Sequence, residues 1–351
     1  MKKSHVNIPV FIPHLGCPNM CVFCNQRAIS GVCSFIPEKA KEDIEAVLST
    51  VKNMREGVEI AFFGGSFTGI DRELMITLLD LAEGYVRAGY VSGIRMSTRP
   101  DYISDEIISV LEHYTVSAVE LGIQSMSDAV LMKSKRGHTA DDTRKAMRLL
   151  KEAGYNTVGQ MMIGLPGSLS DDEIRTAREI CTMGAKASRI YPTVVFRDTE
   201  LCSMTLSGEY TPLTHDEAVK RSADVLEVFI NNGVDCIRIG LCDSENLHSE
   251  NTYFAGDNSP SLGEEVISEI YRRRMTDEIE KLEPDARDGI IAEVRLGDIS
   301  AAVGHYGCNK KYIKEKYNVR NIKFAENEQL ARYDIKIRST IGKGKNVLKI
   351  T

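Results

Sequence analysis

The stretch Gly16-Cys17-Pro18-Asn19-Met20-Cys21-Val22-Phe23-Cys24-Asn25-Gln26 places three cysteines at intervals of four and three residues. It follows an apolar run from Val6 to Pro13, and its Gly, Pro and Asn residues are turn formers. We therefore expect a loop at the end of a strand, where the backbone can bring three sulfurs to one point. A four-iron cluster prefers four thiolates. Three local thiolates without an obvious fourth predict a cluster on Cys17, Cys21 and Cys24 with one iron open to a ligand from outside the protein.

Two other sites fit the same cysteines. A structural zinc ion needs four ligands, and His14 is near enough in sequence to be the fourth. A thioredoxin-type redox pair is the second alternative, but it requires Cys-x-x-Cys at the start of a helix, and the additional Cys17 argues against it.

The remaining six cysteines are scattered and make the total odd: Cys33, Cys181, Cys202, Cys236, Cys242 and Cys308. Such scatter does not indicate a disulfide framework and fits a reducing, anaerobic cytosol. An auxiliary cluster on Cys202, Cys236 and Cys242 is conceivable, although buried packing cysteines are the commoner case.

The length and termini bound the class of protein. A chain of 351 residues can form one large domain and an appendage. It contains no run of about 18 apolar residues, which predicts no membrane span and no membrane partner. Its first residues contain no apolar segment followed by a cleavage site, so we expect a cytoplasmic protein.

Charge is uneven along the chain. Residues 305–351 contain 12 Lys or Arg and 4 Asp or Glu, whereas the remaining residues contain 32 and 46. A basic tail on an acidic body is typical of a nucleic-acid partner, and it is also compatible with a solvated surface helix.

Helical and strand patterns alternate along the first two thirds of the chain. Continuous apolar runs without polar alternation indicate strands buried on both faces, as in parallel sheets, and alternation with helices implies right-handed crossovers. We expect an α/β fold, a partial (βα)6-type TIM-like barrel over residues 1–246, with a small α/β appendage and basic tail over residues 247–351. The expected strands are Val6–Pro13, Val58–Phe63, Gly93–Thr98, Ala118–Gln124, Thr157–Ile163, Ala187–Val195 and Val234–Leu241, and in the appendage a single helix is expected over Ile299–Tyr317.

The unusual motifs follow these strands. In a barrel of parallel strands, active sites lie at the carboxyl ends. The motifs found there are Gly64-Gly65-Ser66, Gln124-Ser125 with Lys135-Arg136-Gly137-His138-Thr139, and Gln160-Met161-Met162-Ile163-Gly164-Leu165-Pro166-Gly167. Their common position predicts one active site.

Together with the cysteine loop, these motifs resemble the radical S-adenosylmethionine (SAM) superfamily. The nearest groups are the radical SAM domain of the Elongator catalytic subunit and the oxygen-independent coproporphyrinogen oxidases. Thr98-Arg99-Pro100-Asp101 and the segment from Ile190 to Leu201 favour the Elongator group. The resemblance runs from about Val6 to Leu241.

The resemblance implies a [4Fe-4S] cluster on Cys17, Cys21 and Cys24, and SAM on its open iron. Gly64, Gly65 and Ser66 would receive the methionine amino group, although Ser66 stands where the family often has Glu. Gln124 would contact the ribose, and Arg136 would pair with the methionine carboxylate, for which a planar guanidinium is suited. Two further departures are Ser97, where the oxidases usually have Glu, and Gln160, where both groups usually have a ribose-binding Asp.

The implied reaction is reductive cleavage of SAM to a 5′-deoxyadenosyl radical that abstracts hydrogen, with electrons from a donor such as ferredoxin or flavodoxin. No acetyltransferase domain is recognisable, so the Elongator reaction is not carried over. The Elongator resemblance and the basic, aromatic segment Asn309–Tyr317 favour RNA or tRNA modification. A small metabolite or tetrapyrrole substrate remains open, as does a non-catalytic cluster- and SAM-binding protein such as a heme carrier.

Overall fold

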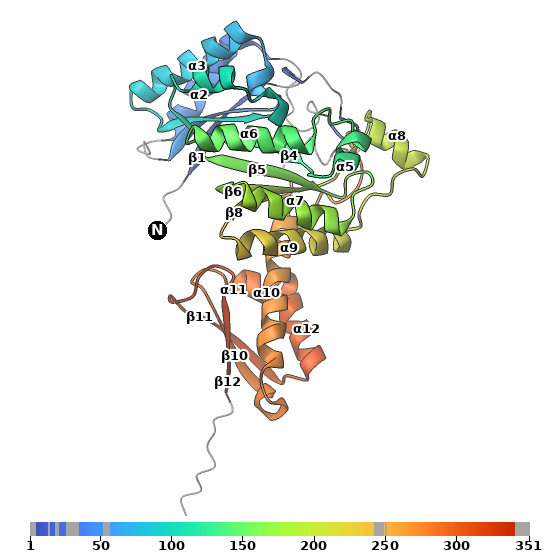
Figure 1. Cartoon of the computed structure of the whole chain (residues 1–351). Helices are drawn as coiled ribbons and strands as arrows, with labels where there is room; N and C mark the ends of the chain where they lie inside the picture. Colours follow the sequence, from blue (N-terminus) through green and yellow to red (C-terminus); the bar gives the residue numbers. More distant parts are fainter. Residues whose placement is uncertain are drawn as a thin grey trace, which may run out of the picture. The chain divides into compact units, whose positions relative to one another are not determined.

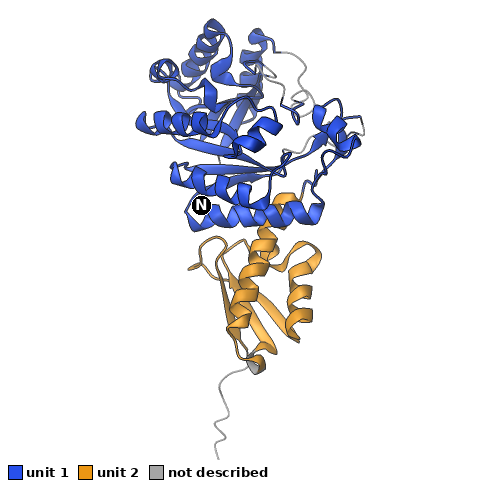
Figure 2. Ribbon diagram, turned by 45° about the vertical axis from the view of Figure 1, so that its right-hand side comes forward, with its two compact units in different colours: residues 1–260 blue, residues 261–351 orange. Residues whose placement is uncertain are grey.

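The computed structural model describes residues 5–12, 15–17, 21–25, 35–51, 57–241, 249 and 251–340. The chain divides into two compact units, residues 1–260 and 261–351, coloured blue and orange in Figure 2. The division falls later than the expected boundary after residue 246. The reason is that β9 (Tyr253–Ala255) pairs antiparallel with β7 (Val195–Phe196) and so belongs to the first unit.

The first unit contains a sheet of seven strands in the order β1-β2-β3-β4-β5-β6-β8. Each described pairing in it is parallel, and each strand lies beside its neighbour in sequence apart from the excursion through β7. The strands are β1 (Val6–Phe11), β2 (Val58–Phe63), β3 (Gly93–Thr98), β4 (Val116–Gln124), β5 (Thr157–Ile163), β6 (Ala187–Pro192) and β8 (Asp235–Ile239).

Helices connect the strands and cover the outer side of the curved sheet, from α2 beside β1 to α9 beside β8 (Figure 1). This arrangement, with β1 and β8 as separate edges, is the partial barrel expected from the sequence. The helices are α2 (Pro37–Thr50), α3 (Arg72–Arg87), α4 (Asp105–Leu111), α5 (Asp128–Lys133), α6 (Ala140–Glu152), α7 (Ser170–Thr182), α8 (Glu200–Leu206) and α9 (His215–Asn231), with 3₁₀ turns η1 (Phe67–Gly69) and η2 (Pro100–Tyr102).

Local sequence explains where several helices begin. Ser104 accepts a hydrogen bond from the Ile107 amide ahead of α4. Thr139 and Thr214 form reciprocal capping boxes at the starts of α6 and α9. Each cap satisfies amides that would otherwise lack an intrahelical partner.

The second unit is the expected small α/β appendage. Its sheet has the order β11-β10-β12, with β10 and β11 parallel and β12 antiparallel to β10. Met275, Ile290, Ile313 and Ile322 are among the residues of its apolar core. The elements are α10 (Leu262–Glu280), η4 (Pro284–Arg287), β10 (Gly289–Val294), α11 (Ile299–Val303), η5 (His305–Gly307), α12 (Cys308–Tyr317), β11 (Asn321–Glu326) and β12 (Ile335–Ser339).

The single helix expected over Ile299–Tyr317 is wrong, because the segment is broken between α11 and α12. Gly304 and Gly307 have φ of +83° and +74°, a conformation that glycine adopts readily and that ends a right-handed helix. A Cβ on Gly304 would also lie 2.6 Å from the Cys308 sulfur. The two glycines therefore turn the chain between the helices.

Within the described ranges, no helix combines the length and apolar character needed to cross a membrane.

Candidate functional site at the carboxyl ends of the strands

The beginning of the cysteine loop packs directly on the loop that follows β2. The Ser66 amide donates to the Leu15 carbonyl at 3.1 Å. A Cβ built on Gly65 would lie 2.4 Å from that carbonyl oxygen, and one on Gly16 would lie 2.3 Å from the Ser66 carbonyl oxygen. Real side chains do not occupy such distances, so both positions require glycine. The close approach at Gly65 is thus made by the chain's own cysteine loop.

The end of the cysteine loop is held between α5 and α8. The Val22 amide donates to the Ser134 carbonyl at 3.2 Å, and the Leu201 amide donates to the Val22 carbonyl at 2.8 Å. Val22 and Leu201 are both buried in an apolar cluster that also contains Cys202 and Tyr210. Segments more than a hundred residues away therefore fix the position of Val22.

The three thiols of the loop have different neighbours. Cys17 Sγ lies 3.4 Å from Ser66 Oγ, and Arg136 donates from NH1 to Cys21 Sγ at 3.5 Å. The Cys24 amide donates to the Cys21 carbonyl at 3.0 Å. None of the three forms a disulfide with another described cysteine. Among the described residues, no group of three His, Cys, Asp or Glu side chains has the arrangement of a metal site.

Three expected site residues, Arg136, Gln124 and Gln160, lie around Gly122 on β4. Arg136 donates from NH2 to the Gly122 carbonyl at 2.9 Å. A Cβ on Gly122 would lie 2.6 Å from Arg136 NH2 and 3.0 Å from Gln124 Nε2. Gln160 is the partner of Gly122 on β5 in the sheet register. The absent side chain at residue 122 leaves room for the Arg136 guanidinium beside the strand.

Among the residues that the structure describes, buried polar atoms without hydrogen-bond partners are concentrated near Cys21. They include Arg136 Nε, Gln124 Oε1, Arg99 NH1 and both ring nitrogens of His138. Gln124 also has φ of +64°, a rare conformation for a non-glycine residue that places strain at this strand end. Buried polar groups are normally paired, so such a concentration marks a place where a polar ligand or water belongs.

Electrostatics in this cluster favour a neutral histidine between charged groups. Burial, followed by the nearby Arg136, lowers the pKa of His138 to about 4. Arg99 is 1% exposed and makes a two-pronged ion pair with Asp101, at 2.9 and 2.8 Å. This ion pair outweighs burial and raises the pKa of Arg99, so its charge is retained.

A second polar cluster, which we call the Glu120 layer, lies on the inner face of the sheet. Arg95 NH1 and Arg189 NH2 lie 3.1 and 2.9 Å from Glu120 Oε1. Arg189 Nε and Gln160 Nε2 lie 2.9 and 2.8 Å from Glu120 Oε2. Glu120 is 0% exposed, and Arg95 also contacts Glu59 at 2.9 Å. Three hydrogen bonds and one ion pair thus hold this carboxylate, and Arg189 Nε, which makes the ion pair, has no hydrogen-bond partner among the described residues.

Two further expected residues, Ser97 and Gly64, lie near the carboxyl ends of β3 and β2. Ser97 on β3 is the register partner of Glu120. Gly64 has φ of +99° and follows β2. Tyr191 receives a hydrogen bond from Arg189 at 3.3 Å, and Arg238 donates to the carbonyls of Gly240 and Leu241. Cys33, Cys242 and His14 lie outside the described residues.

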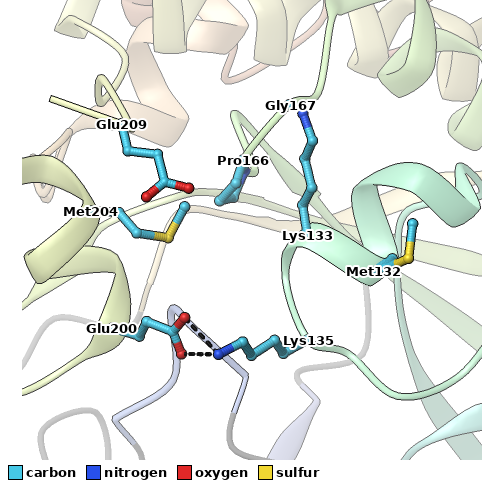
Figure 3. A pocket seen from close by; sticks show the side chains of 8 residues that line it. All are labelled: Met132, Lys133, Lys135, Pro166, Gly167, Glu200, Met204 and Glu209. Carbon is cyan, nitrogen blue, oxygen red and sulfur yellow. Dashed lines mark hydrogen bonds and ion pairs between the residues drawn. The ribbon is translucent and has the colours of Figure 1, made fainter.

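A hollow of about 340 Å³ is lined by residues of α5, of α8 and of the loop after β5, among others (Figure 3). Lys135 Nζ lies 2.6 Å from both carboxylate oxygens of Glu200 across it. These two residues immediately follow Ser134 and precede Leu201, which bracket Val22. The hollow is lined by Met132, Lys133, Lys135, Pro166, Gly167, Glu200, Met204 and Glu209.

Sequence reasoning did not assign roles to Arg99, His138 or Glu120. Arg99 and His138 stand inside motifs that were recognised, so their polar character close to the cysteines was an available signal. The link between Glu120 and Gln160 joins neighbouring strands 40 residues apart in sequence. No sequence spacing reveals that contact.

Comparison with known proteins identifies the family. The model of the Radical SAM superfamily matches residues 11–180, and that of the Radical_SAM C-terminal domain matches residues 185–272. The chain belongs to the radical SAM superfamily and is an enzyme of that type. Members of this superfamily bind a [4Fe-4S] cluster and SAM, and the unpaired buried groups beside Cys21 fit such a polar ligand.

Two relatives match parts of this chain. An uncharacterized protein of Methanocaldococcus jannaschii is 30% identical over 239 residues, 64% of this chain and 72% of that protein. The tRNA uridine(34) acetyltransferase of Methanocaldococcus infernus is 37% identical over 128 residues, 36% of this chain. This chain spans 24% of the length of that acetyltransferase.

A solved structure shares the fold. The archaeal Methanocaldococcus infernus Elp3 with an N-terminal deletion has a TM-score of 0.62 and 23% identity, covering 78% of this chain and 64% of that one. The fold described here is thus shared with a known structure.

Proposed function

We propose that Cys17, Cys21 and Cys24 hold the [4Fe-4S] cluster and that SAM binds between the cluster and Gly122. The observation that carries this proposal is the Arg136 guanidinium, which contacts Cys21 Sγ and the Gly122 carbonyl while its Nε is buried without a partner. Metal binding and local folding are coupled in proteins, so cluster assembly would draw the three thiols together.

Each chain residue then has a limited task. Arg136 pairs with the methionine carboxylate, Gly64, Gly65 and Ser66 face its amino group, and Gln124, Gln160 and Ser97 bind the nucleoside. When bound, the cluster and SAM supply one-electron chemistry that removes a hydrogen atom from the substrate. The apolar cluster around Val22 and Leu201 keeps water from the loop.

The proposed substrate is RNA, with tRNA as the leading candidate. The tRNA-modifying relative supports this proposal, as do exposed lysines on α12 of the second unit: Lys310, Lys311 and Lys314. The aromatic residues of α12 have another task. Ile313 is buried, and the Tyr312 and Tyr317 rings are covered by cations, with Lys316 Nζ 5.6 and 4.9 Å from their centroids. We therefore assign the lysines to phosphate contacts and do not assign base stacking to the tyrosines.

An enzyme of this type needs a reduced electron donor. We propose that this donor is a ferredoxin or a flavodoxin. We also propose that the protein is located in the cytoplasm, because RNA and low-potential electron donors are both present there.

Release of 5′-deoxyadenosine tests the catalytic proposal. Anaerobically reconstituted protein with SAM and dithionite is expected to release it. A non-catalytic carrier of cluster and SAM would bind both and release none, and that result would contradict the proposal.

Salt-dependent tRNA binding tests the substrate proposal. Replacing Lys310, Lys311 and Lys314 by Gln should weaken binding and reduce the slope of log K against log salt by about one for each lysine that contacts phosphate. The matched control replaces three exposed lysines of the first unit, Lys145, Lys151 and Lys186. An equal loss of tRNA affinity in both variants, or no loss in the α12 variant, would show that α12 does not bind RNA.

A further inference from the structure

Tyr306 is the most exposed large apolar or aromatic side chain in the part of the chain that the structure describes. It is 98% exposed, and the next of this kind, Met132, is 75% exposed. A single exposed apolar residue is common on protein surfaces and by itself indicates no function. The backbone of Tyr306 is uncommon, however, because it lies in the left-handed region, with φ of +49° and ψ of +26°.

A tight turn between α11 and α12 carries Tyr306. The Gly307 amide donates to the Gly304 carbonyl at 2.8 Å and closes the turn around His305 and Tyr306. Glycine and asparagine adopt left-handed backbone angles at a lower cost than tyrosine does. The turn would therefore form more readily without the Tyr306 ring, and the fold of the second unit does not account for it.

Buried contacts anchor this turn. Asn309 is 1% exposed, and its Nδ2 donates to the carbonyls of Ser268 and Ala302 at 2.8 and 3.2 Å. One buried side chain of α12 thus joins α10 and α11 beside the turn. The His305 ring adds an edge contact to the Tyr306 ring, with centroids 4.1 Å apart and an interplanar angle of 66°. The exposed ring is therefore presented from an anchored segment.

Lysines lie on the exposed face of α12, directly after the turn. Lys310, Lys311 and Lys314 are exposed, whereas Asn309 and Ile313 face the core. Lys310 and Lys314 are one helical turn apart, and neither makes an ion pair within the described part of the chain. Two unpaired positive charges close in sequence to an exposed aromatic ring favour a ligand that carries both an aromatic ring and negative charge.

An RNA nucleotide combines these two features in its base and its phosphate. Stacking on an aromatic side chain tolerates any base, because every base has a flat π face. Bases inside a duplex already stack on one another, so Tyr306 can receive only an unpaired base of a loop or a single-stranded end. A membrane or protein partner would require further apolar side chains, but the residues beside Tyr306 in the chain are His305, Gly307 and Cys308.

We infer that Tyr306 is a stacking platform for one unpaired base of the RNA, and that Lys310 and Lys314 contact phosphates next to that base. The inference rests on the proposed RNA substrate and adds the kind of nucleotide that the second unit recognises. It also separates Tyr306 from Tyr312 and Tyr317, whose rings are covered by a cation of the chain itself.

The first measurement compares binding of the full chain to a tRNA transcript and to an RNA duplex without unpaired residues. Tyr306→Ala should weaken tRNA binding by about 5- to 150-fold, the range for loss of one stacked base, and leave duplex binding unchanged. Tyr306→Phe keeps the ring and should bind tRNA as wild type does. Because Tyr306→Ala removes no phosphate contact, the slope of log K against log salt should keep its wild-type value.

Fluorescence gives a second readout, because the chain contains no tryptophan. Tyr306→Trp introduces a single indole at the turn, and stacking on a base should quench its emission when the tRNA transcript is added. Tyr90→Trp is the matched control, since Tyr90 is 56% exposed in the first unit and also makes an edge contact, with Tyr85 at 6.3 Å. The emission of this control should not change.

Four results would each overturn the stacking role: wild-type tRNA affinity in Tyr306→Ala, an equal loss of duplex binding, a loss in Tyr306→Phe as large as in Tyr306→Ala, or equal emission changes in the two tryptophan variants. If tRNA binding depends on the α12 lysines and not on Tyr306, the proposed substrate stands and only the stacking role fails. If wild type does not bind tRNA, the proposed RNA substrate fails and the stacking role fails with it. Urea unfolding should show that Tyr306→Ala is as stable as wild type, because the ring that it removes is almost fully exposed.

Discussion

The two buried polar clusters of the barrel differ in how completely they are paired. In the Glu120 layer three hydrogen bonds and one ion pair reach the carboxylate, and within the described part of the chain only Arg189 Nε of the groups that contact it lacks a hydrogen-bond partner. Near Cys21, by contrast, Arg99, Gln124, Arg136 and His138 all have buried atoms without hydrogen-bond partners in the described part of the chain. A cluster in which nearly all polar groups are paired is stable as it stands, whereas one with many unpaired groups costs free energy until something binds. The comparison separates a part of the barrel whose polar groups satisfy one another from a part whose polar groups are available to a ligand.

The largest expected effect is at the polar cluster near Cys21. Cys21→Ala should abolish the iron–sulfur absorbance at about 400 nm, because two thiolates rarely hold this kind of cluster. The measurement is the visible spectrum and iron content after anaerobic reconstitution. Cys308→Ala, an exposed cysteine of the second unit, is the control and should keep the full spectrum. A normal spectrum for Cys21→Ala would show that this loop does not bind the cluster.

Substitutions in the Glu120 layer should change the free energy of unfolding. Glu120→Ala leaves two guanidiniums inside the barrel without their shared carboxylate and should lower the free energy of unfolding by about 3–5 kcal/mol. Urea unfolding of the protein measures the change. Glu179→Ala, which removes a partly exposed ion pair with Arg144, should cost less than about 1 kcal/mol. Similar costs for the two variants would mean that the Glu120 layer is not the rigid part of the barrel.

Acid should destabilise the protein through His138. Its pKa is lowered by burial to about 4 in the folded chain, against a usual value near 6.5. Between these pH values the unfolded chain binds a proton that the folded chain does not, so the free energy of unfolding falls as pH decreases from about 6.5 to 4. We expect a loss of about 2–3 kcal/mol over this range. Unfolding curves of His138→Gln should lack that part of the pH dependence, and an unchanged dependence would exclude His138 as its source.

Arg136→Gln should have the smallest effect on the fold and a selective effect on the ligand. Loss of a charge-assisted hydrogen bond is expected to weaken SAM binding by about 10- to 100-fold. Stability should change little, since Arg136 Nε has no partner to lose and the Gly122 carbonyl can accept from the new amide. Binding by the variant at wild-type affinity would contradict the assignment of the polar cluster near Cys21 to SAM.

Sequence patterns predicted the sheet better than the connections. The bounds of β2, β3 and β5 match expectation because their apolar runs end at glycine, arginine–proline or glycine signals. The strand expected over Ala187–Val195 ends at Pro192 and continues as β7, which pairs with the distant β9. That partner, like α5 and α8, depends on packing around the cysteine loop and leaves no regular period in the sequence.

The membership of the candidate site stays a prediction from the sequence, and the pairing of its charged groups was not predicted. The cysteines and Arg136 stand in a recognisable order, and the structure brings Arg136 to Cys21. The Glu120 layer could not be foreseen, because its ion pairs depend on which strands are neighbours and on which face each side chain lies. Arginine is usually exposed, yet the side chains of Arg95 and Arg189 are only 12% and 13% exposed in the folded chain.

The bracketing of Val22 by Ser134 and Leu201 has a consequence for synthesis on the ribosome. The cysteines emerge first, but the segments that close over them follow more than a hundred residues later. At a translation rate of roughly 5–20 residues per second, Cys21 waits on the order of ten seconds or more before Leu201 exists. During that interval the nascent thiols are open to iron delivery and to oxidation, so anaerobic expression with ample iron should decide how much intact enzyme a cell yields.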